Sequence, residues 1–517
     1  MITPTRRAFL GGMSGSMLAV GLGSSLLGRA GYALGLEEAA LDALDFGELE
    51  PLATLIQETL PEELQRALIG RIRGGAELHT LVAAAALANA RTFGGQDYVG
   101  YHCQMALVPA LEMSKLLPAA RKPLPVLKVL YRTANRIQEC GGRSNEALHA
   151  LPEAAPARRE ESAARLREAF LKRDLEGAER AFSELSRNGS AAAFDALQTI
   201  LQENLDVHRV VLAWRAWEGM QLTGERHAET LLRQSVRFCV DAEKERRRRG
   251  RPEPELRSLL PELLDEHELA DGSRETRSAS DEEVEELALG IFRADKADAA
   301  STVADALGSG LARADVGEAL SLAANHILMH DQGRSRANAS REKPIGSVHG
   351  ASPGVHASDA ARAWRNIAAV TGGRNAAASL IAGAYHTAGQ SGYVGKRPFA
   401  FRERMDEVGG TRDGEELLRA ACEALEAGDQ ELTCAAVHRY GEMGASAGPL
   451  FDALLAYGTS QDGALHAEKY FYTVREEFAD ARPAFRWRHL VALARVTASE
   501  YGFPAPGYES ALEELGV

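Results

Sequence analysis

The chain has 517 residues, of which 73 are acidic and 59 are Lys or Arg, so its formal net charge is −14 at pH 7. A protein this acidic is repelled by nucleic acids and by anionic lipid surfaces, and neither is expected to be its main partner. Its five cysteines are few and odd in number, which excludes a scaffold built on disulfides.

The first 33 residues have the features of a twin-arginine export signal. Arg6 and Arg7 precede a weakly apolar stretch over 11–27, and a site of small residues ends at Ala33. The stretch is too rich in glycine to make a good membrane span. We therefore expect a signal peptide over 1–33, no span in the mature protein, and a periplasmic or otherwise extracytoplasmic location. The twin-arginine export machinery, the expected partner, carries proteins that have already folded, often around a metal or redox cofactor.

Apolar residues recur at three- and four-residue spacing through most of the chain after residue 36. The clearest runs are 76–92, 98–117, 123–140, 190–219, 284–307, 316–330, 413–427 and 484–500. The segments 160–188 and 190–219 have the pattern of antiparallel helical hairpins, and no run of alternating β-branched residues predicts a strand. The sequence therefore predicts an all-α fold, a large multi-helix assembly of antiparallel hairpins.

Two polar segments interrupt this pattern. Residues 268–282 are predicted to be an exposed linker, which would separate an N-terminal helical region (34–267) from a C-terminal, histidine-rich region (283–517) as two lobes. Residues 331–355 are rich in Gly, Ser and Arg, and a loop of this length inside a helical protein is usually functional or disordered. We favour a functional loop because it contains one histidine and runs directly into another.

Histidine is the residue type that most suggests a functional site, since eight of the 14 lie between 326 and 489. Five early histidines are predicted to be surface or structural residues, because they lie on amphipathic or polar stretches: His79, His149, His208, His227 and His267. His326 and His330 are four apart and share a helix face. That spacing can present two metal ligands, although such a pair without a partner carboxylate is usually incidental.

Five other histidines are candidate metal ligands, because most of them have small or apolar neighbours: His102, His349, His356, His438 and His466. For each one alone, the ordinary interpretation is a buried structural histidine. Several together make a shared site more plausible than any single one does. Asp359 follows His356 by about one helical turn and could orient its imidazole.

Lys469 lies three residues after His466 and shares its predicted helix face. Three interpretations are open: a base with a depressed pKa, a lysine whose charge reaches solvent, or, once carbamylated by carbon dioxide, an oxygen ligand. Lys469 and Asp359 are the candidate catalytic residues, and Lys469 is also a candidate metal ligand.

Three segments resemble, in order, motifs of the questin oxidase-like proteins. They are 102–112, which opens with His102-Cys103-Gln104 and runs to a glutamate, the helix start 356–365, and Leu465-His466-Ala467-Glu468-Lys469-Tyr470. The likeness loosely covers 90–480. It implies an all-helical protein that oxidises aromatic polyketides with dioxygen, and a mononuclear iron held by several histidines and a carboxylated lysine.

The chain departs from this family pattern in two places. Relatives often have a second histidine four residues before the first motif, where this chain has Tyr98. The export signal and the stretch 220–280 are also unlike the fungal enzymes. The fold and the metal site are therefore expected to carry over more readily than the substrate.

The leading hypothesis is an exported metal-dependent oxidoreductase or oxygenase. Its cofactor would be a mononuclear non-haem iron, and its reactants dioxygen and a small organic, aromatic molecule. Neutral imidazoles and one anionic oxygen suit Fe(II), although zinc or another divalent metal is an alternative.

Two other functions stay open. One is a non-catalytic periplasmic metal-binding or helical scaffold protein, in which the histidines close the coordination shell. The other is a metal-dependent hydrolase, which would need more carboxylate ligands. The sequence contains no Walker, Cys-x-x-Cys-His or His-Glu-x-x-His motif. No nucleotide or flavin site is therefore expected.

Overall fold

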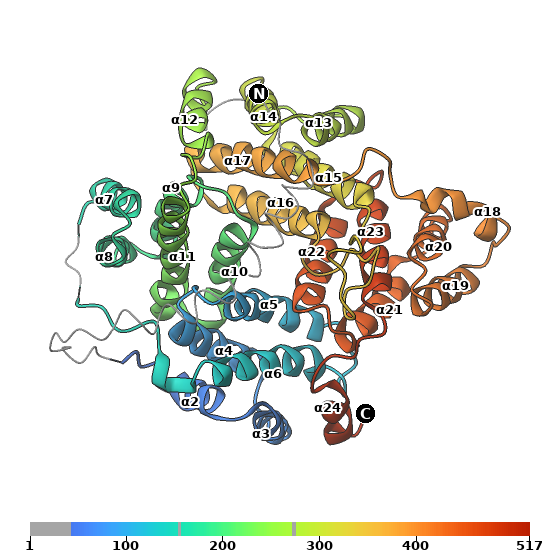
Figure 1. The fold of residues 1–517 in the computed structure, drawn as a ribbon, viewed down its shortest axis with the longest axis horizontal. Helices are drawn as coiled ribbons and strands as arrows, with labels where there is room; N and C mark the ends of the chain where they lie inside the picture. The colour runs from blue at the N-terminus through green and yellow to red at the C-terminus, as the bar shows by residue number, and fades with distance from the viewer. Residues whose placement is uncertain (1–42, 154–156, 271–275) are drawn as a thin grey trace.

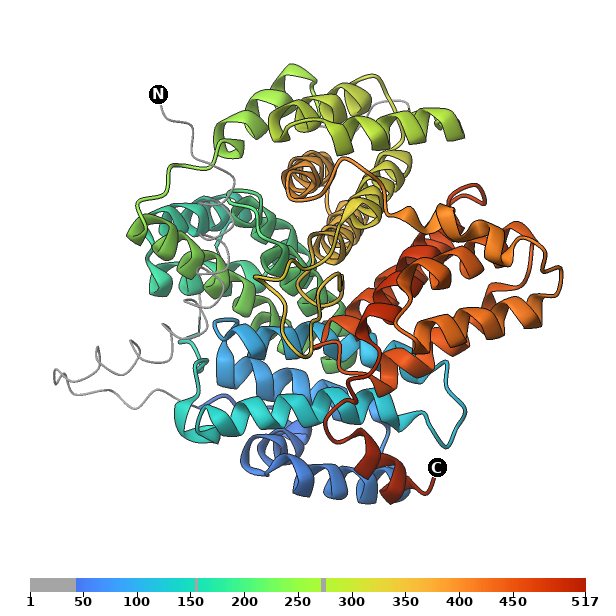
Figure 2. The ribbon, with the colours of Figure 1, turned by 45° about the vertical axis from the view of Figure 1, so that its right-hand side comes forward.

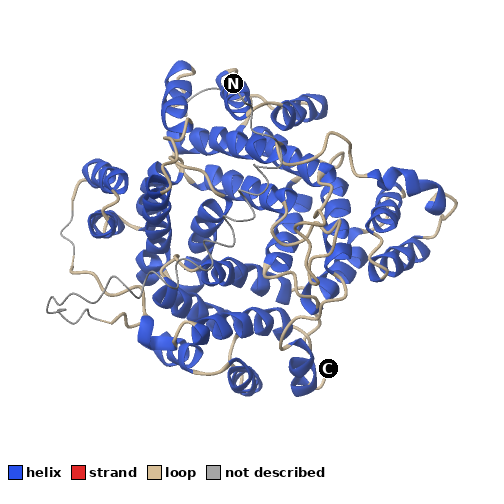
Figure 3. Ribbon diagram, in the orientation of Figure 1, coloured by secondary structure: helices blue, strands red, loops and turns tan. Residues whose placement is uncertain are grey.

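The computed structural model describes residues 43–153, 157–270 and 276–517, and the predicted signal peptide over 1–33 lies outside them. Within the described residues the chain forms 23 α-helices, four short 3₁₀-helices and two isolated β-bridges, with no strand (Figure 3). This confirms the prediction of an all-α, multi-helix fold. None of the helices in these ranges is both long and apolar enough to cross a membrane.

The helices of the first half are α2 (Glu50–Glu58), α3 (Pro61–Arg73), α4 (Leu78–Phe93), α5 (Tyr98–Ser114), α6 (Pro123–Glu139), α7 (Arg159–Lys172), α8 (Leu175–Ser186), α9 (Ser190–Leu201), α10 (Val207–Thr223), α11 (Ala228–Arg248) and α12 (Leu256–Glu266). Those of the second half are α13 (Asp281–Arg293), α14 (Lys296–Gly308), α15 (Arg313–His330), α16 (Pro353–Val370), α17 (Gly373–Ser391), α18 (Met405–Val408), α19 (Gly414–Glu426), α20 (Gln430–Glu442), α21 (Ala447–Ser460), α22 (His466–Asp480), α23 (Arg486–Glu500) and α24 (Tyr508–Leu515). The 3₁₀-helices are η1 (Gly47–Leu49), η2 (Gly142–Asn145), η3 (Glu225–His227) and η4 (Ala400–Arg404).

Capping aspartates divide some of the periodic runs. The predicted hairpins 160–188 and 190–219 each contain two helices, and the run 284–307 is divided as well. In each case the side chain of an aspartate accepts hydrogen bonds from the first backbone N–H groups of the second helix: Asp174, Asp206 and Asp295. Such an N-cap stabilises a helix start at one residue, a signal that hydrophobic spacing alone does not contain.

The hydrophobic core has two parts, and their boundary does not follow 268–282. The larger cluster takes residues from both sides of this segment, most of them between Phe46 and Ala388, and includes Leu269 within the segment itself. The smaller cluster consists mainly of side chains between 401 and 498. Since helices before and after 268–282 share one core, a division into two lobes at this segment has no counterpart in the packing.

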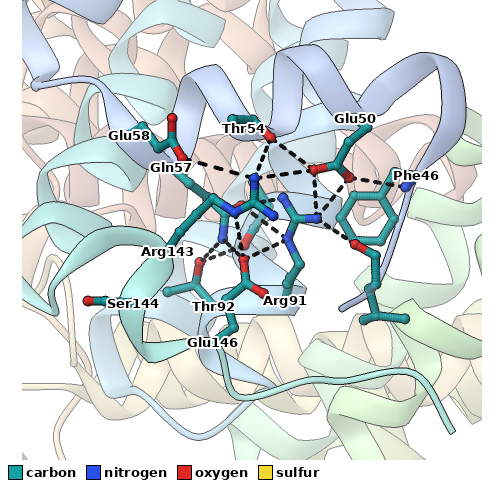
Figure 4. Close-up of polar contacts among 12 residues, drawn as sticks. Phe46, Glu50, Thr54, Gln57, Glu58, Arg91, Thr92, Arg143, Ser144 and Glu146 are labelled. Atoms are coloured by element: carbon teal, nitrogen blue, oxygen red, sulfur yellow. Dashed lines mark hydrogen bonds and ion pairs between the residues drawn. The ribbon is translucent and has the colours of Figure 1, made fainter. Parts of the chain in front are cut away.

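A buried arginine joins the N-terminal helices (Figure 4). Arg91 of α4 is fully buried and pairs with Glu50 of α2 at 2.8 Å and with Glu146 at 3.1 Å. Its guanidinium also donates to the side chain of Gln57 and to the carbonyl of Leu44. Because a buried charge requires both an opposite charge and hydrogen bonds, this network fixes α2 against α4.

Four helices meet in the middle of the molecule: α5, α10, α16 and α22 (Figure 1). α5 packs on α10 and α22, and α16 packs on the same two helices, so the four make a closed ring of contacts. The helices α18 to α20 extend to one side of the molecule in both views (Figures 1 and 2). The central ring therefore assembles segments that lie far apart in the sequence.

Candidate metal site

Each of the four central helices contributes one histidine to a buried cluster. The members are His102 of α5, His208 of α10, His356 of α16 and His466 of α22, each 7% exposed or less. The ring centroids of neighbouring members lie between 4.8 and 5.4 Å apart. The closest approach is between the Nε2 atoms of His356 and His466, at 3.3 Å.

All four histidines lie within the first five residues of their helices. The N-terminal ends of four helices therefore converge on one point. Because a helix N-terminus carries a partial positive charge, this environment favours neutral imidazoles and disfavours imidazolium ions. It also favours an anion close to the cluster.

Hydrogen bonds fix the orientation of two of the rings through backbone carbonyls. His102 Nδ1 donates to the carbonyl of Tyr98 at 2.6 Å, and His466 Nδ1 donates to the carbonyl of Ala464 at 3.0 Å. A carbonyl can only accept, so Nδ1 carries the proton in both rings. Nε2 of each neutral ring then keeps its lone pair for a partner inside the cluster.

A carboxylate orients the third ring. His208 Nδ1 lies 3.2 Å from Oδ1 of Asp206, the N-cap residue of α10. The Nε2 atoms of His208 and His102 are buried and have no hydrogen-bond partner among the described residues. A buried nitrogen without a partner is unfavourable. A histidine that donates from one nitrogen to a carbonyl or carboxylate, and keeps the other free, is typical of metal ligands.

Burial favours the neutral form of three of the rings. Desolvation lowers the pKa of His102, His356 and His466 well below the usual range, and Lys469 and the neighbouring histidines lower it further. The neutral imidazole is the form that binds metal ions, so the cluster is ready for a ligand role at neutral pH.

Lys469 is buried on the same helix as His466, with 2% of its surface exposed. Desolvation lowers the pKa of its ammonium to about 8, against the opposing effects of Asp359 and Glu468. No ion pair to Lys469 occurs among the described residues. An ammonium buried without a counter-ion is unfavourable, so the surroundings favour the neutral amine or a modified form.

Asp359 does not make the predicted hydrogen bond to His356. Its Oδ1 instead accepts from Thr473 Oγ1 of α22 at 2.9 Å. Burial raises the pKa of the Asp359 carboxyl, while Lys469 and Arg215 lower it. Asp359 therefore influences the cluster through its charge and through the packing of α16 on α22.

The turn before α22 places His466 through a strained backbone. Ala464 and Leu465 have φ angles of 50° and 65°, a region that residues other than glycine rarely adopt. Asp462 accepts from the N–H of Ala464 at 3.0 Å, and Lys128 of α6 donates to a carbonyl of the same turn at 2.7 Å. Strain that is maintained by surrounding bonds is characteristic of functional sites.

The structure brings together three of the five predicted histidines, and the other two lie elsewhere. His349 has both ring nitrogens in hydrogen bonds at 3.0 Å, one with Ser499 Oγ and one with the carbonyl of Glu342. Because both nitrogens of the His349 ring have partners, neither is available to the cluster. The ring has a structural role in the loop 331–352.

His438 lies in the C-terminal helices, away from the central ring. Its ring is 5.6 Å from that of Phe401, and its Nε2 is 3.3 Å from Oε1 of Glu442. It lines a surface groove to which none of the four clustered histidines contributes. Its helix α20 packs on α19, α23 and η4, which explains why a similar local sequence leads to a different place.

His208 is the member of the cluster that the sequence analysis missed. A signal was present: Asp206 is an N-cap residue two positions before it, and 210–213 are apolar on every face of the helix that follows. An N-cap followed by an apolar run predicts a helix whose start is buried. A histidine at such a start belongs with the other candidates.

As placed, no group of three or more His, Cys, Asp or Glu side chains in the described ranges could hold a metal ion. The fit is therefore partial. Two nitrogens bound to one ion at about 2.0–2.1 Å are roughly 3.0–3.4 Å apart. The separation of 3.3 Å between the Nε2 atoms of His356 and His466 meets this requirement. The donor set, all imidazole, suits iron, zinc or copper.

Comparison of the chain with models of protein families, with curated proteins and with solved structures found no match.

Proposed function

We propose that the four central histidines bind one divalent transition-metal ion, with iron as the first candidate. On this basis the protein is an exported metal-dependent oxidoreductase that acts with dioxygen on a small organic, aromatic substrate. The observation that supports it most is the orientation of three of the imidazoles, His102, His208 and His466: a carbonyl or carboxylate acceptor lies at Nδ1 of each, which leaves the Nε2 lone pair for a partner inside the cluster. A bound iron would supply the activation of dioxygen.

The protein residues would provide the rest of the site. The imidazoles are neutral donors, so a dication among them needs an anion nearby. Lys469, if carbamylated by carbon dioxide, would provide an anionic oxygen on the same helix as His466. The converging helix N-termini favour the same anion. The burial of all four rings limits water, which strengthens these electrostatic interactions.

A second candidate is a non-catalytic metal-binding or scaffold protein. The contact between His356 and His466 favours it, because a neutral His356 can donate its Nε2 proton to the lone pair of His466 with no ion present. A closed zinc site would use the same four nitrogens without an open position.

The test is metal analysis of the purified protein, combined with oxygen uptake. We expect about one iron per chain, and loss of most of it in the His208→Ala, His356→Ala and His466→Ala variants. His438→Ala is the matched control and should keep its metal. Full metal content in His356→Ala and His466→Ala would refute the site. Zinc without oxygen uptake would favour the second candidate.

A further inference from the structure

A groove on the surface, separate from the histidine cluster, has the features of a second binding site. It encloses about 1390 Å³ between α13, α15, α20, α23 and the segment 388–402, which comprises the end of α17 and the residues that follow it. None of the residues that line it belongs to the central cluster. The proposed metal chemistry therefore leaves this groove unexplained.

Aromatic rings form much of the lining. The groove residues include Phe292, Phe399, Phe401 and Trp487. Phe292 also packs against two histidine rings of α15, with centroid distances of 5.6 Å to His326 and 4.7 Å to His330. Surfaces of this kind favour a flat aromatic ligand through stacked and edge-to-face contacts.

Polar atoms accompany these rings. The Nε2 atom of His326 is buried without a hydrogen-bond partner among the described residues, although Glu285 Oε1 lies 3.4 Å away. His330 Nδ1 donates to the carbonyl of His326 at 2.8 Å, so its proton is fixed there. His438 lines the groove from α20. The imidazoles can therefore make hydrogen bonds to a ligand in addition to ring contacts.

The charge of the groove is opposite to that of the protein. It contains five basic side chains, Arg293, Lys296, Lys396, Arg402 and Arg488, and two acidic ones, Glu285 and Asp295. Both acids are engaged, since Glu285 pairs with Arg488, and Asp295 caps α14 by accepting from the backbone. The other four cations have no ion-pair partner in the described part of the chain. In a protein of net charge −14, this concentration of cations selects for an anion.

We propose that this groove binds a small planar aromatic anion, such as an arene carboxylate. The ring of the ligand lies against Phe292 and Phe401, and its negative charge faces Lys396 and Arg402. Both features are required together: the aromatic lining alone would accept any flat apolar molecule, and the cations alone any anion. The groove is thus a binding site distinct from the proposed metal centre.

The test is calorimetric titration of the full-length mature protein with three probes. These are 2-naphthoate, its neutral analogue 2-naphthalenemethanol, and its saturated analogue decahydro-2-naphthoate. We expect 2-naphthoate to bind with a Kd below about 1 mM, and each analogue to bind at least about tenfold more weakly, since it lacks either the charge or the flat ring.

Paired variants locate the site. Lys396→Gln combined with Arg402→Gln should weaken 2-naphthoate binding by about tenfold or more. Lys122→Gln combined with Arg412→Gln removes two exposed cations outside the groove and should leave binding unchanged. All four positions are on the surface, so folding is expected to be retained, and circular dichroism checks it.

Three results would overturn the proposal. They are no binding of 2-naphthoate at millimolar concentration, equal binding of the neutral alcohol, and equal losses in the groove and control variants. Binding that disappears in His466→Ala but persists in the groove variant would also overturn it, because the ligand would then occupy the central site. Failure of the metal proposal has no effect on these measurements, so the two are tested separately.

Discussion

At the scale of single residues, Lys469 is the side chain on which the chemistry of the central site most depends. It is buried close to three imidazoles whose pKa is lowered by burial, those of His102, His356 and His466, and it has no acidic partner within ion-pair distance among the described residues. If it is carbamylated and binds the metal, Lys469→Ala should lose most of the metal and the oxygen uptake. Added acetate or formate should restore part of both, because a small carboxylate can occupy the space and supply the missing anionic oxygen.

Lys343→Ala is a matched control for this experiment, since burial also lowers the pKa of Lys343. It should keep its metal and should not respond to added acetate. If Lys469→Ala retains full metal content and full oxygen uptake, Lys469 is not a ligand, and the resemblance to the questin oxidase-like proteins loses its most specific support.

Glu500 is a second buried group whose ionisation has a measurable consequence. Its side chain is 2% exposed, and its Oε1 has no partner among the described residues. Burial, opposed by Lys128 and assisted by Glu468, raises the pKa of its carboxyl from 4.5 to about 8. The folded protein therefore keeps a proton that the unfolded chain releases above pH 4.5.

The sign of the pH effect follows from this difference. The contribution of Glu500 to stability is fully present below the unfolded pKa and is lost as the pH rises toward 8, by at most about 1.4 kcal/mol per pH unit. Glu500→Gln, which cannot ionise, should flatten the dependence of unfolding free energy on pH between 5 and 8 and should stabilise the protein at pH 8. Urea unfolding at several pH values measures it. The exposed Glu509→Gln should leave the slope unchanged, and an unchanged slope in Glu500→Gln itself would disprove the prediction.

At the scale of helices, the network around Arg91 predicts an asymmetry between two arginines that face the same carboxylates. Arg91 is fully buried, whereas Arg143 is 35% exposed and contacts Glu50 at 3.8 Å and Glu146 at 3.2 Å (Figure 4). Arg91→Ala leaves two partly buried carboxylates, those of Glu50 and Glu146, without their main partner, which should cost about 3–5 kcal/mol. Arg143→Ala removes a half-exposed pair and should cost about 1 kcal/mol or less.

Denaturant midpoints of the two variants give the comparison directly. If Arg91→Ala and Arg143→Ala lose equal stability, Arg91 is not the main residue that stabilises the contact between α2 and α4. The wild-type protein and the Arg143→Ala variant should in contrast unfold at nearly the same denaturant concentration.

The helices themselves could be predicted from the sequence, because an amphipathic helix needs only local periodicity. The divisions at Asp206 and Asp295 depend on side-chain caps, which short-range hydrophobic spacing does not record. The core packing does not follow the predicted division into two lobes at 268–282, and the reason is again that local sequence does not record tertiary contacts. A polar segment predicts exposure of that segment, but it does not predict whether the helices on its two sides bury their apolar faces against each other.

At the scale of the whole molecule, three of the five predicted histidines lie together and two do not, because only the tertiary arrangement selects which residues meet. His438 has small apolar neighbours, as His356 does, yet α20 packs in the C-terminal helices, whereas α16 belongs to the central ring. His208 has a more polar local sequence, yet α10 lies between α5 and α16. Local composition identifies histidines that can be buried, and the arrangement of the packed helices determines which of these histidines meet.

The cluster forms only when the four central helices have packed together, and this has a consequence for export. The four clustered histidines come from positions 102, 208, 356 and 466, so a metal site made of them exists only after most of the chain has folded. All four rings are buried, which makes uptake of an ion easier before or during folding than after it. The twin-arginine pathway, which transports folded proteins, would allow the metal to be inserted before export.

Replacing Arg6 and Arg7 with Lys should therefore block export and leave a folded, metal-containing precursor inside the cell. Cell fractionation followed by metal analysis of the retained protein measures both parts of this prediction. A matched variant, Arg29→Lys, changes an arginine that lies outside the pair and should be exported normally. Normal export of the double variant would contradict the twin-arginine signal. Retention of a folded precursor without metal would instead leave the signal intact, and would show that the central histidines acquire any ion only after export.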